Sequence, residues 1–172
     1  MESIIKNITF SKLIFILFFY FCYTSISYAQ PGLPQRFITV QATQSLHFGT
    51  FALIGGNAGT VTVGYNGVRS SSDVFLSPIS PTAQPAIFEV KLCQGRNVTI
   101  TYVPSITLTG SNGGSFTMDI GPTEKGVNGA VFAVNNDCNF ITTLRVGGTL
   151  HIPPFSPAGV YSGTFEIIFE QE

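Results

Sequence analysis

The sequence predicts an all-β protein, folded as an antiparallel β-sandwich, and three observations support this prediction. Apolar and polar residues alternate with a period of two along much of the chain, as in strands with one face in a core and one in water. Many of the 18 Gly and 10 Pro residues lie between these runs, where they favour turns. Stretches free of Gly, Pro, Asn and Asp rarely reach the length of a three-turn helix.

The first segment, residues 1–29, is predicted to be a secretory signal peptide rather than part of the fold. Lysines precede an uncharged apolar run at 13–22, and the small residues Ser27 and Ala29 then form a typical cleavage site. The run is about half as long as the roughly 20 residues that a membrane span needs. We therefore expect cleavage between Ala29 and Gln30 and no transmembrane segment in the mature chain.

The mature chain, residues 30–172, is predicted to be a single β-sandwich domain of about nine or ten short strands. The clearest alternating runs are 86–92, 97–102, 115–120, 143–152 and 159–170. Turn residues separate the runs, and Asn66-Gly67 and the segment 110–114 are predicted to close hairpins. This spacing favours an immunoglobulin-like sandwich, with a jelly roll or a small barrel as the alternative.

The cysteines are consistent with export to an oxidising compartment. Cys22 lies in the predicted signal peptide, which leaves Cys93 and Cys138 as an even pair in the mature chain. Such a pair in an exported protein is expected to form a disulfide, with two free buried thiols as the alternative. A zinc site needs more ligands than these two cysteines provide.

The inventory of chemically active residues predicts a protein that is not an enzyme. Charged residues make up only 10% of the chain and the net charge is −1, which excludes an electrostatic nucleic-acid binder. His47 and His151 are the only histidines, and both are expected at solvated strand positions. The carboxylates are expected on outward faces and in loops, and no serine-hydrolase motif or phosphate loop occurs. We predict no catalytic residue, no metal site and no cofactor.

Several stretches together resemble a known family. They are 46–51 (Leu-His-Phe-Gly-Thr-Phe), 59–63 (Gly-Thr-Val-Thr-Val), 146–150 (Val-Gly-Gly-Thr-Leu) and 159–165 (Gly-Val-Tyr-Ser-Gly-Thr-Phe). In this order they resemble the bacterial exported family called domain of unknown function 4402, and the last is similar to the closing strand of pilin-like and spore-coat-U-like secreted domains. The resemblance implies an immunoglobulin-like exported domain of a Gram-negative bacterium with no catalytic residue to carry over. Pilins usually keep their disulfide in the first half of the domain, unlike Cys93 and Cys138.

These observations lead to one main functional hypothesis and two alternatives. The main hypothesis is an exported, non-enzymatic structural or surface protein, such as a fimbria-like subunit that assembles by β-strand addition. It would work in the periplasm, at the cell surface or after secretion, with itself or a periplasmic chaperone as partner. The first alternative is a secreted monomeric binding module for a glycan or a peptide. The second, less favoured, is a hydrolase with paired carboxylates.

The C-terminus supplies the predicted assembly strand. Its residues are Gly159, Tyr161, Phe165, Ile167 and Phe169, which resemble the glycine and alternating apolar residues that end pilin subunits. Such a strand at a sheet edge can accept a strand from a partner. The expected donor is segment 36–42 of a second chain, where Ile38, Val40 and Ala42 alternate. The alternative is that segment 36–42 pairs within its own domain and that the C-terminal strand is central.

Overall fold

A computed structural model of the chain describes residues 37–171, apart from residues 94 and 136. The predicted signal peptide and its cleavage site between Ala29 and Gln30 lie outside the described residues, as does Arg36. None of the described residues forms a helix that is long and apolar enough to cross a membrane.

The described residues contain strands and turns and no helix, which confirms the all-β fold class. The strands are β1 (Phe37–Gln44), β2 (Phe51–Leu53), β3 (Gly59–Val63), β4 (Arg69–Ser72), β5 (Val74–Leu76), β6 (Ala86–Cys93), β7 (Asn97–Tyr102), β8 (Ser105–Gly110), β9 (Ser115–Thr123), β10 (Val131–Ala133), β11 (Thr142–Ile152), β12 (Tyr161–Ser162) and β13 (Ile167–Gln171). More strands form than the sequence predicted, because several of them are only two or three residues long.

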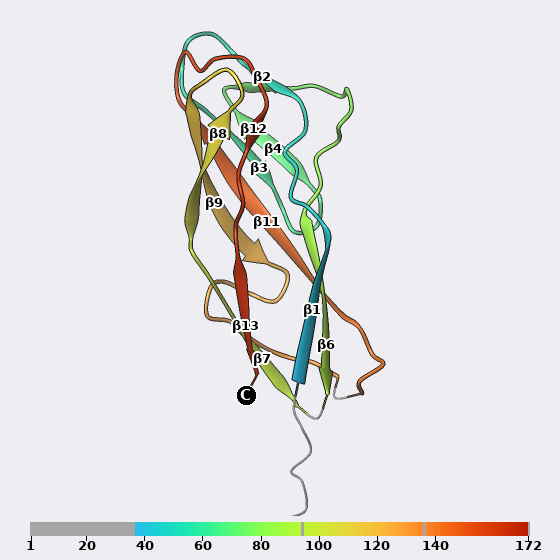
Figure 1. Cartoon of the computed structure of the whole chain (residues 1–172). Helices are drawn as coiled ribbons and strands as arrows, with labels where there is room; N and C mark the ends of the chain where they lie inside the picture. The colour runs from blue at the N-terminus through green and yellow to red at the C-terminus, as the bar shows by residue number, and fades with distance from the viewer. Residues whose placement is uncertain (1–36, 94, 136, 172) are drawn as a thin grey trace, which may run out of the picture. The chain divides into compact units, whose positions relative to one another are not determined.

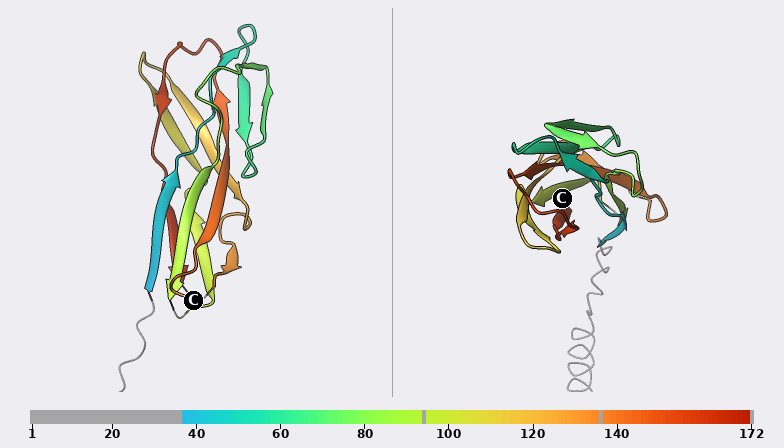
Figure 2. Two further views of the ribbon diagram at one scale, coloured as in Figure 1. Left: turned by 90° about the vertical axis from the view of Figure 1, so that its right-hand side faces the viewer. Right: turned by 90° about the horizontal axis from the view of Figure 1, so that it is seen from above.

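The strands form three antiparallel sheets (Figure 1). The large sheet has the order β1-β6-β11-β9-β8-β12, and β3 and β4 extend it from β11. A three-stranded sheet has the order β10-β7-β13, and β2 pairs with β5 in a small third sheet. Seen from above, the C-terminal strand lies between β8 on one side and β1 on the other (Figure 2). This arrangement agrees with a β-sandwich, and the narrower immunoglobulin-like topology stays a prediction.

The longest strand, β11, organises the large sheet. Its first half pairs with β6 and its second half with β3, while β9 pairs along the other edge. The register with β9 shifts between Val146 and Gly148, where a bulge forms. Gly147 fits there because a Cβ atom at this position would meet the Val63 carbonyl oxygen of β3. The glycine pair of β11 therefore lets β3 and β9 approach the strand closely from both sides.

The turns agree with the turn chemistry of the sequence. The Asn66-Gly67 turn joins β3 to β4, with Gly67 at a φ of 81° and its N–H donating to the Gly64 carbonyl over 2.9 Å. Segment 110–114 joins β8 to β9 as a hairpin. Both predicted hairpins are therefore confirmed.

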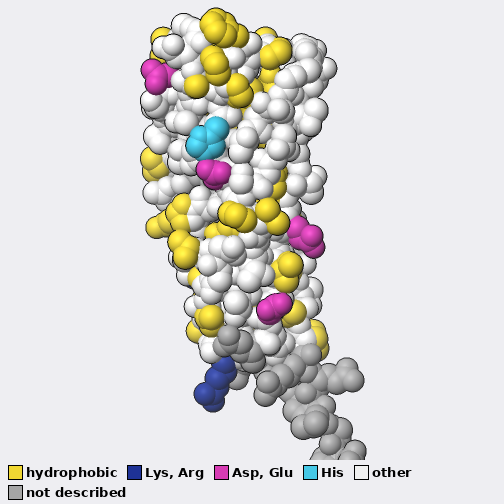
Figure 3. Space-filling model, turned by 90° about the vertical axis from the view of Figure 1, so that its left-hand side faces the viewer, with side chains coloured by type: hydrophobic (Ala, Val, Ile, Leu, Met, Phe, Trp, Pro, Cys, Tyr) yellow, Lys and Arg dark blue, Asp and Glu magenta, His cyan; other side chains and the backbone are white. Residues whose placement is uncertain are grey.

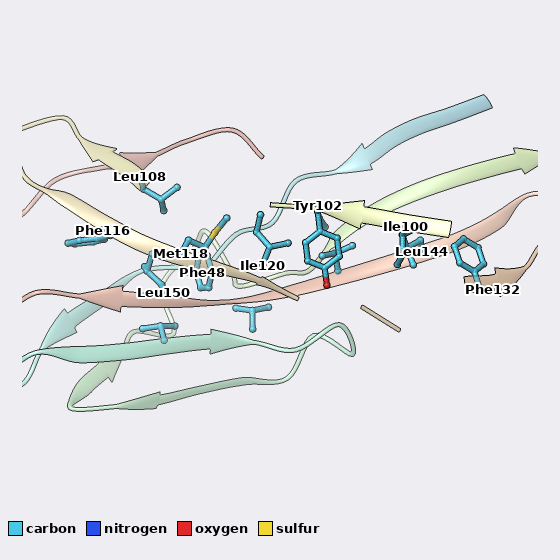
Figure 4. Close-up of a cluster of buried hydrophobic side chains, with 14 of the residues drawn as sticks. Phe48, Ile100, Tyr102, Leu108, Phe116, Met118, Ile120, Phe132, Leu144 and Leu150 are labelled. Atoms are coloured by element: carbon cyan, nitrogen blue, oxygen red, sulfur yellow. The ribbon is translucent and has the colours of Figure 1, made fainter. Parts of the chain in front are cut away.

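The core lies between the large sheet and the three-stranded sheet. Side chains from β7, β8, β9, β10 and β11, together with Phe48, point into this common interior (Figure 4). The inward residues of β7, Val98, Ile100 and Tyr102, are all buried, as their alternation predicted. Neighbouring core residues of the large sheet include Leu92, Leu144 and Leu150, which are at most 2% exposed. Burial of this apolar surface is the main stabilising contribution to the fold.

Candidate functional site

The predicted assembly strand is not one continuous strand. Gly159 lies in the loop before β12, β12 pairs with β8, and β13 pairs with β7 in the other sheet. Residues 163–166 form the crossing between the two sheets and belong to neither. Gly163 passes directly over β8, where an added Cβ atom would lie 2.6 Å from Leu108 Cδ2 and 3.1 Å from the Thr107 carbonyl oxygen.

The alternating side chains of this segment face the core on both sides of the crossing. Tyr161 stacks on Phe116, with ring centroids 3.5 Å apart and planes 11° from parallel. Phe165 and Phe169 both pack against Phe88 of β6, at centroid distances of 6.4 and 5.9 Å. Ile167 also packs against the core and is partly buried. The period-two pattern therefore predicted the inward face, although it could not show the change of sheet.

Strand β13 has a free outer edge. Opposite Phe169, Ile100 of β7 donates its N–H to the Ala130 carbonyl over 3.0 Å, and its own carbonyl accepts the Gly129 N–H over 2.8 Å. Both backbone groups of Ile100 thus point away from β13. In an antiparallel ladder, facing residues either exchange both bonds or neither. Phe169, and Ile167 two residues earlier, therefore direct their N–H and C=O groups outward, where no described strand pairs with β13.

In the single chain, the described part of the expected donor segment pairs within its own domain, as the alternative expected. It belongs to β1, which pairs with β6 from Phe37 opposite Cys93 to Gln44 opposite Ile87. Donation of this segment to a second chain stays a prediction. The alternative is wrong for the C-terminus, because β13 lies at the edge of its sheet and not in the centre.

Strand β1 contributes little to the core. Ile38, Val40 and Ala42 lie opposite inward residues of β6, so they share the inner face. Val40 is nevertheless 37% exposed, whereas its partner Val90 is completely buried. Among the described strands, β1 pairs only with β6, and its other edge approaches β13 to within 8 Å between Cα atoms without forming a ladder. We call this place, where the free edges of β1 and β13 lie next to each other, the seam.

The predicted disulfide is confirmed, because Cys93 is bonded to Cys138. Cys93 ends β6, and Cys138 lies in the loop between β10 and β11, with 4.6 Å between the Cα atoms. The bond therefore fixes this loop to β6, the strand that pairs with β1.

The two histidines lie in different surroundings. His151 Nε2 is 2.7 Å from Asp119 Oδ2, and both side chains are about half exposed. His47 is half-buried, and its Nδ1 accepts the Gly49 N–H over 2.8 Å, so it is not the freely solvated residue that the sequence suggested. His151 borders a shallow depression of about 320 Å³, together with Thr60, Asp73, Thr117 and Pro153 among others. The exposed contact between His151 and Asp119 is expected to contribute little to stability.

No group of three or more His, Cys, Asp or Glu side chains among the described residues has an arrangement suited to a metal ion. The seam is therefore the feature of this structure that stands out, because its free backbone edges and partly exposed apolar side chains are suited to a protein strand.

Comparisons with known proteins give one match. Neither a curated protein nor a solved structure matches the chain significantly. A family model described as domain of unknown function (DUF4402) matches residues 38–170, which begins in β1 and ends in β13. The chain belongs to this family of domains of unknown function, as its sequence motifs suggested.

Proposed function

We propose that the protein is an exported, non-enzymatic structural subunit that joins other copies of itself by exchange of β1. In the isolated chain, β1 occupies the place between β6 and β13 of its own domain. In the assembly, β1 of one copy takes this place in the next copy. The observation that supports the proposal most strongly is that β1 pairs with a described strand on one side only and is exposed along most of its length.

Exchange of β1 costs little free energy because the same contacts form again. The donated strand reproduces the register with β6, so Ile38, Val40 and Ala42 face Leu92, Val90 and Phe88 of the second copy. Exchange of an identical element is a low-cost route to association. Repeated from chain to chain, it joins many copies without a separate interface.

A hinge for the exchange lies near the end of β1. The register of β1 with β6 shifts between Ala42 and Gln44, so Thr43 interrupts the ladder. Past the hinge, the chain is anchored again, because His47 and Gln84 exchange backbone hydrogen bonds of 2.9 and 2.8 Å and Phe48 enters the core. The strand can therefore leave while the rest of the domain keeps its contacts.

The seam provides a second reason for strand addition. The outward N–H and C=O groups of Ile167 and Phe169 have no partner strand among the described residues. An edge strand with free backbone groups is a template for pairing with another chain. A strand added along β13 would satisfy these groups and cover Phe88, which is only partly buried.

The Cys93–Cys138 disulfide supports export, since such bonds persist in the periplasm, at the cell surface and outside the cell. A periplasmic chaperone could hold the same β13 edge before assembly, because the edge is suited to any extended strand.

A deletion experiment tests the proposal. The mature protein without residues 30–42 should stay folded by circular dichroism, remain monomeric by sedimentation and bind a synthetic peptide of residues 37–44. The matched control lacks residues 30–36 only, keeps β1 and should still assemble. A shortened protein that assembles as well as this control would contradict the proposal. The same conclusion would follow if the intact mature protein were monomeric at every concentration.

A further inference from the structure

One end of the domain carries three large apolar side chains that are each more than half exposed. Phe155 is 85% exposed, Val160 is 74% exposed and Ile54 is 58% exposed. Phe155 and Val160 lie in the loop between β11 and β12, and Ile54 lies in the turn between β2 and β3. We call these three residues the apolar tip. Contiguous exposed apolar side chains are uncommon on soluble domains and mark interaction surfaces.

Two features fix the position of Phe155, namely its backbone conformation and its contact with Gly56. Its φ is 57°, in the left-handed region that a bulky side chain rarely adopts. Its ring covers Gly56, where an added Cβ atom would lie 2.6 Å from Phe155 Cε1. The contact joins the two loops that carry the tip. A strained backbone that holds an aromatic ring in solvent indicates that the ring has a function there.

The backbone of the Phe155 loop has already used many of its polar groups. Pro153, Pro154 and Pro157 have no N–H group. The bonds of the loop are Ser156 Oγ to Pro153 O (2.6 Å), Tyr161 OH to Pro157 O (2.7 Å), Asn112 Nδ2 to Ala158 O (2.7 Å), Val160 N to Ser111 Oγ (3.1 Å) and Ser111 N to Val160 O (2.9 Å). A loop that enters an apolar medium must satisfy its backbone groups internally, and these bonds do so for both groups of Val160 and for the carbonyls of Pro153, Pro157 and Ala158.

The apolar tip carries no charge. Residues 51–60, 106–118 and 152–165 contain no Asp, Glu, Lys, Arg or His. The ionisable residues near these segments include Asp73, whose backbone carbonyl accepts the Ile54 N–H over 3.0 Å, and Asp119, which lies 2.7 Å from His151. Figure 3 shows hydrophobic side chains gathered at the upper end of one face, with an acidic side chain at the edge of this region and no Lys or Arg visible there. The tip therefore does not favour a charged partner.

The apolar tip lies at the end of the domain opposite to the start of β1 and the end of β13. In Figure 1 the loops that carry it are at the top, whereas β1 begins and β13 ends at the bottom. A contact at the tip therefore leaves β1 and β13 accessible, and it is independent of the proposed strand exchange.

We infer that the apolar tip inserts into the surface of an electrically neutral lipid bilayer. Phe155, Val160 and Ile54 enter the boundary between the headgroups and the acyl chains, while Asp73 and the His151–Asp119 pair stay in the headgroup layer. Binding of this kind depends on the apolar area that is buried.

Tryptophan fluorescence gives a direct test, because the chain contains no Trp. The mature protein with Phe155→Trp should show a blue-shifted emission when phosphatidylcholine vesicles are added, and lipids brominated in their acyl chains should quench it. The matched control is Phe140→Trp, since Phe140 is 50% exposed and lies in the β10–β11 loop beside the disulfide. Its emission should not change.

Vesicle co-sedimentation measures the contribution of each residue. Phe155→Asn should lower the partition coefficient at least about tenfold, and asparagine tolerates the left-handed backbone. Val160→Thr keeps the shape of the side chain and should lower the coefficient several-fold, while Phe140→Asn should change it less than about twofold. Circular dichroism of each variant verifies that the domain is folded.

Three results would overturn the inference. The first is an unchanged Phe155→Trp spectrum at saturating phosphatidylcholine. The second is binding that requires anionic lipid, since the tip offers no positive charge. The third is a self-association of the protein without vesicles that Phe155→Asn abolishes, which would assign the tip to a protein contact.

Discussion

Val40 of β1 lies directly opposite Val90 of β6, yet the two valines have very different surroundings. Val90 has no exposed surface and is flanked by β1 and β11, whereas Val40 is 37% exposed on the same inner face. The difference shows where the core ends. The large sheet is complete up to β6, and β1 lies beyond it as an attached edge strand.

Truncation of the two valines should therefore lower the free energy of unfolding by different amounts. Val90→Ala removes two fully buried methyl groups and should lower the free energy of unfolding by roughly 2 kcal/mol. Val40→Ala should lower it by less than about 1 kcal/mol, since part of its surface is already in water. Urea unfolding followed by circular dichroism measures both values. Equal losses for the two variants would mean that β1 is as well packed as β6.

Loss of the disulfide should destabilise the domain without abolishing its strands. Cys93→Ser combined with Cys138→Ser should lower the free energy of unfolding by about 2–4 kcal/mol, since the unfolded chain is no longer constrained. The comparison is made by denaturant unfolding against the oxidised protein. Mass spectrometry under non-reducing conditions should find the two cysteines in one linked peptide pair. Two alkylatable thiols in the exported protein would contradict this expectation.

Alkaline pH should destabilise the domain through Tyr102. Burial raises the pKa of the Tyr102 phenol above its ordinary value. The native state then holds this proton at a pH at which the unfolded chain has released it. The free energy of unfolding should therefore be unaffected below about pH 10 and should fall as the pH rises above it. Tyr102→Phe should reduce the alkaline loss, and a pH profile of unfolding that is identical in both proteins would exclude Tyr102 as its cause.

Gln171 offers a substitution that should stabilise the protein. Its Nε2 atom is buried, has no hydrogen-bond acceptor in the part of the chain that the structure describes and would lie 2.6 Å from a Cβ atom at Gly95. A buried donor without a partner costs about 1–3 kcal/mol. Gln171→Met keeps the length of the side chain and removes the donor, so the melting temperature should rise. A matched control is Glu170→Met on the exposed face of β13, which should leave the melting temperature nearly unchanged.

The sequence predicted the strands that have one wet face. Asn97–Tyr102 forms β7 with the expected bounds and buried face, and 143–152 forms all but the first residue of β11. One face of such a strand packs on the core and the other faces water. The alternation of apolar and polar residues is therefore enough to predict the strand and its buried face. Short strands such as β10 and β12 lack enough residues to show a period.

The candidate site could be predicted only in part. The inward residues of the C-terminus followed from alternation, and Phe165, Ile167 and Phe169 do pack against the core. Which strand pairs with which depends on contacts between distant segments, and a period of two contains no information on them. For this reason the sequence showed neither the crossing at 163–166 nor the pairing of β1 with β6. The exposure of Phe155 could not be predicted from the sequence either, because its loop has no alternation of apolar and polar residues.

Cross-linking between differently labelled chains tests strand exchange most directly. Thr39 lies opposite Lys91 on the outer face of the β1–β6 pair, and both side chains are exposed. Chains with Thr39→Cys are mixed with chains with Lys91→Cys, allowed to assemble and treated with a short bismaleimide. Exchange of β1 predicts covalent dimers joined between residues 39 and 91, and far fewer dimers when the second chain carries Val103→Cys. If the mixture gives no more dimers than this control, while a single chain with both cysteines becomes linked internally, β1 stays in its own domain and the account is contradicted.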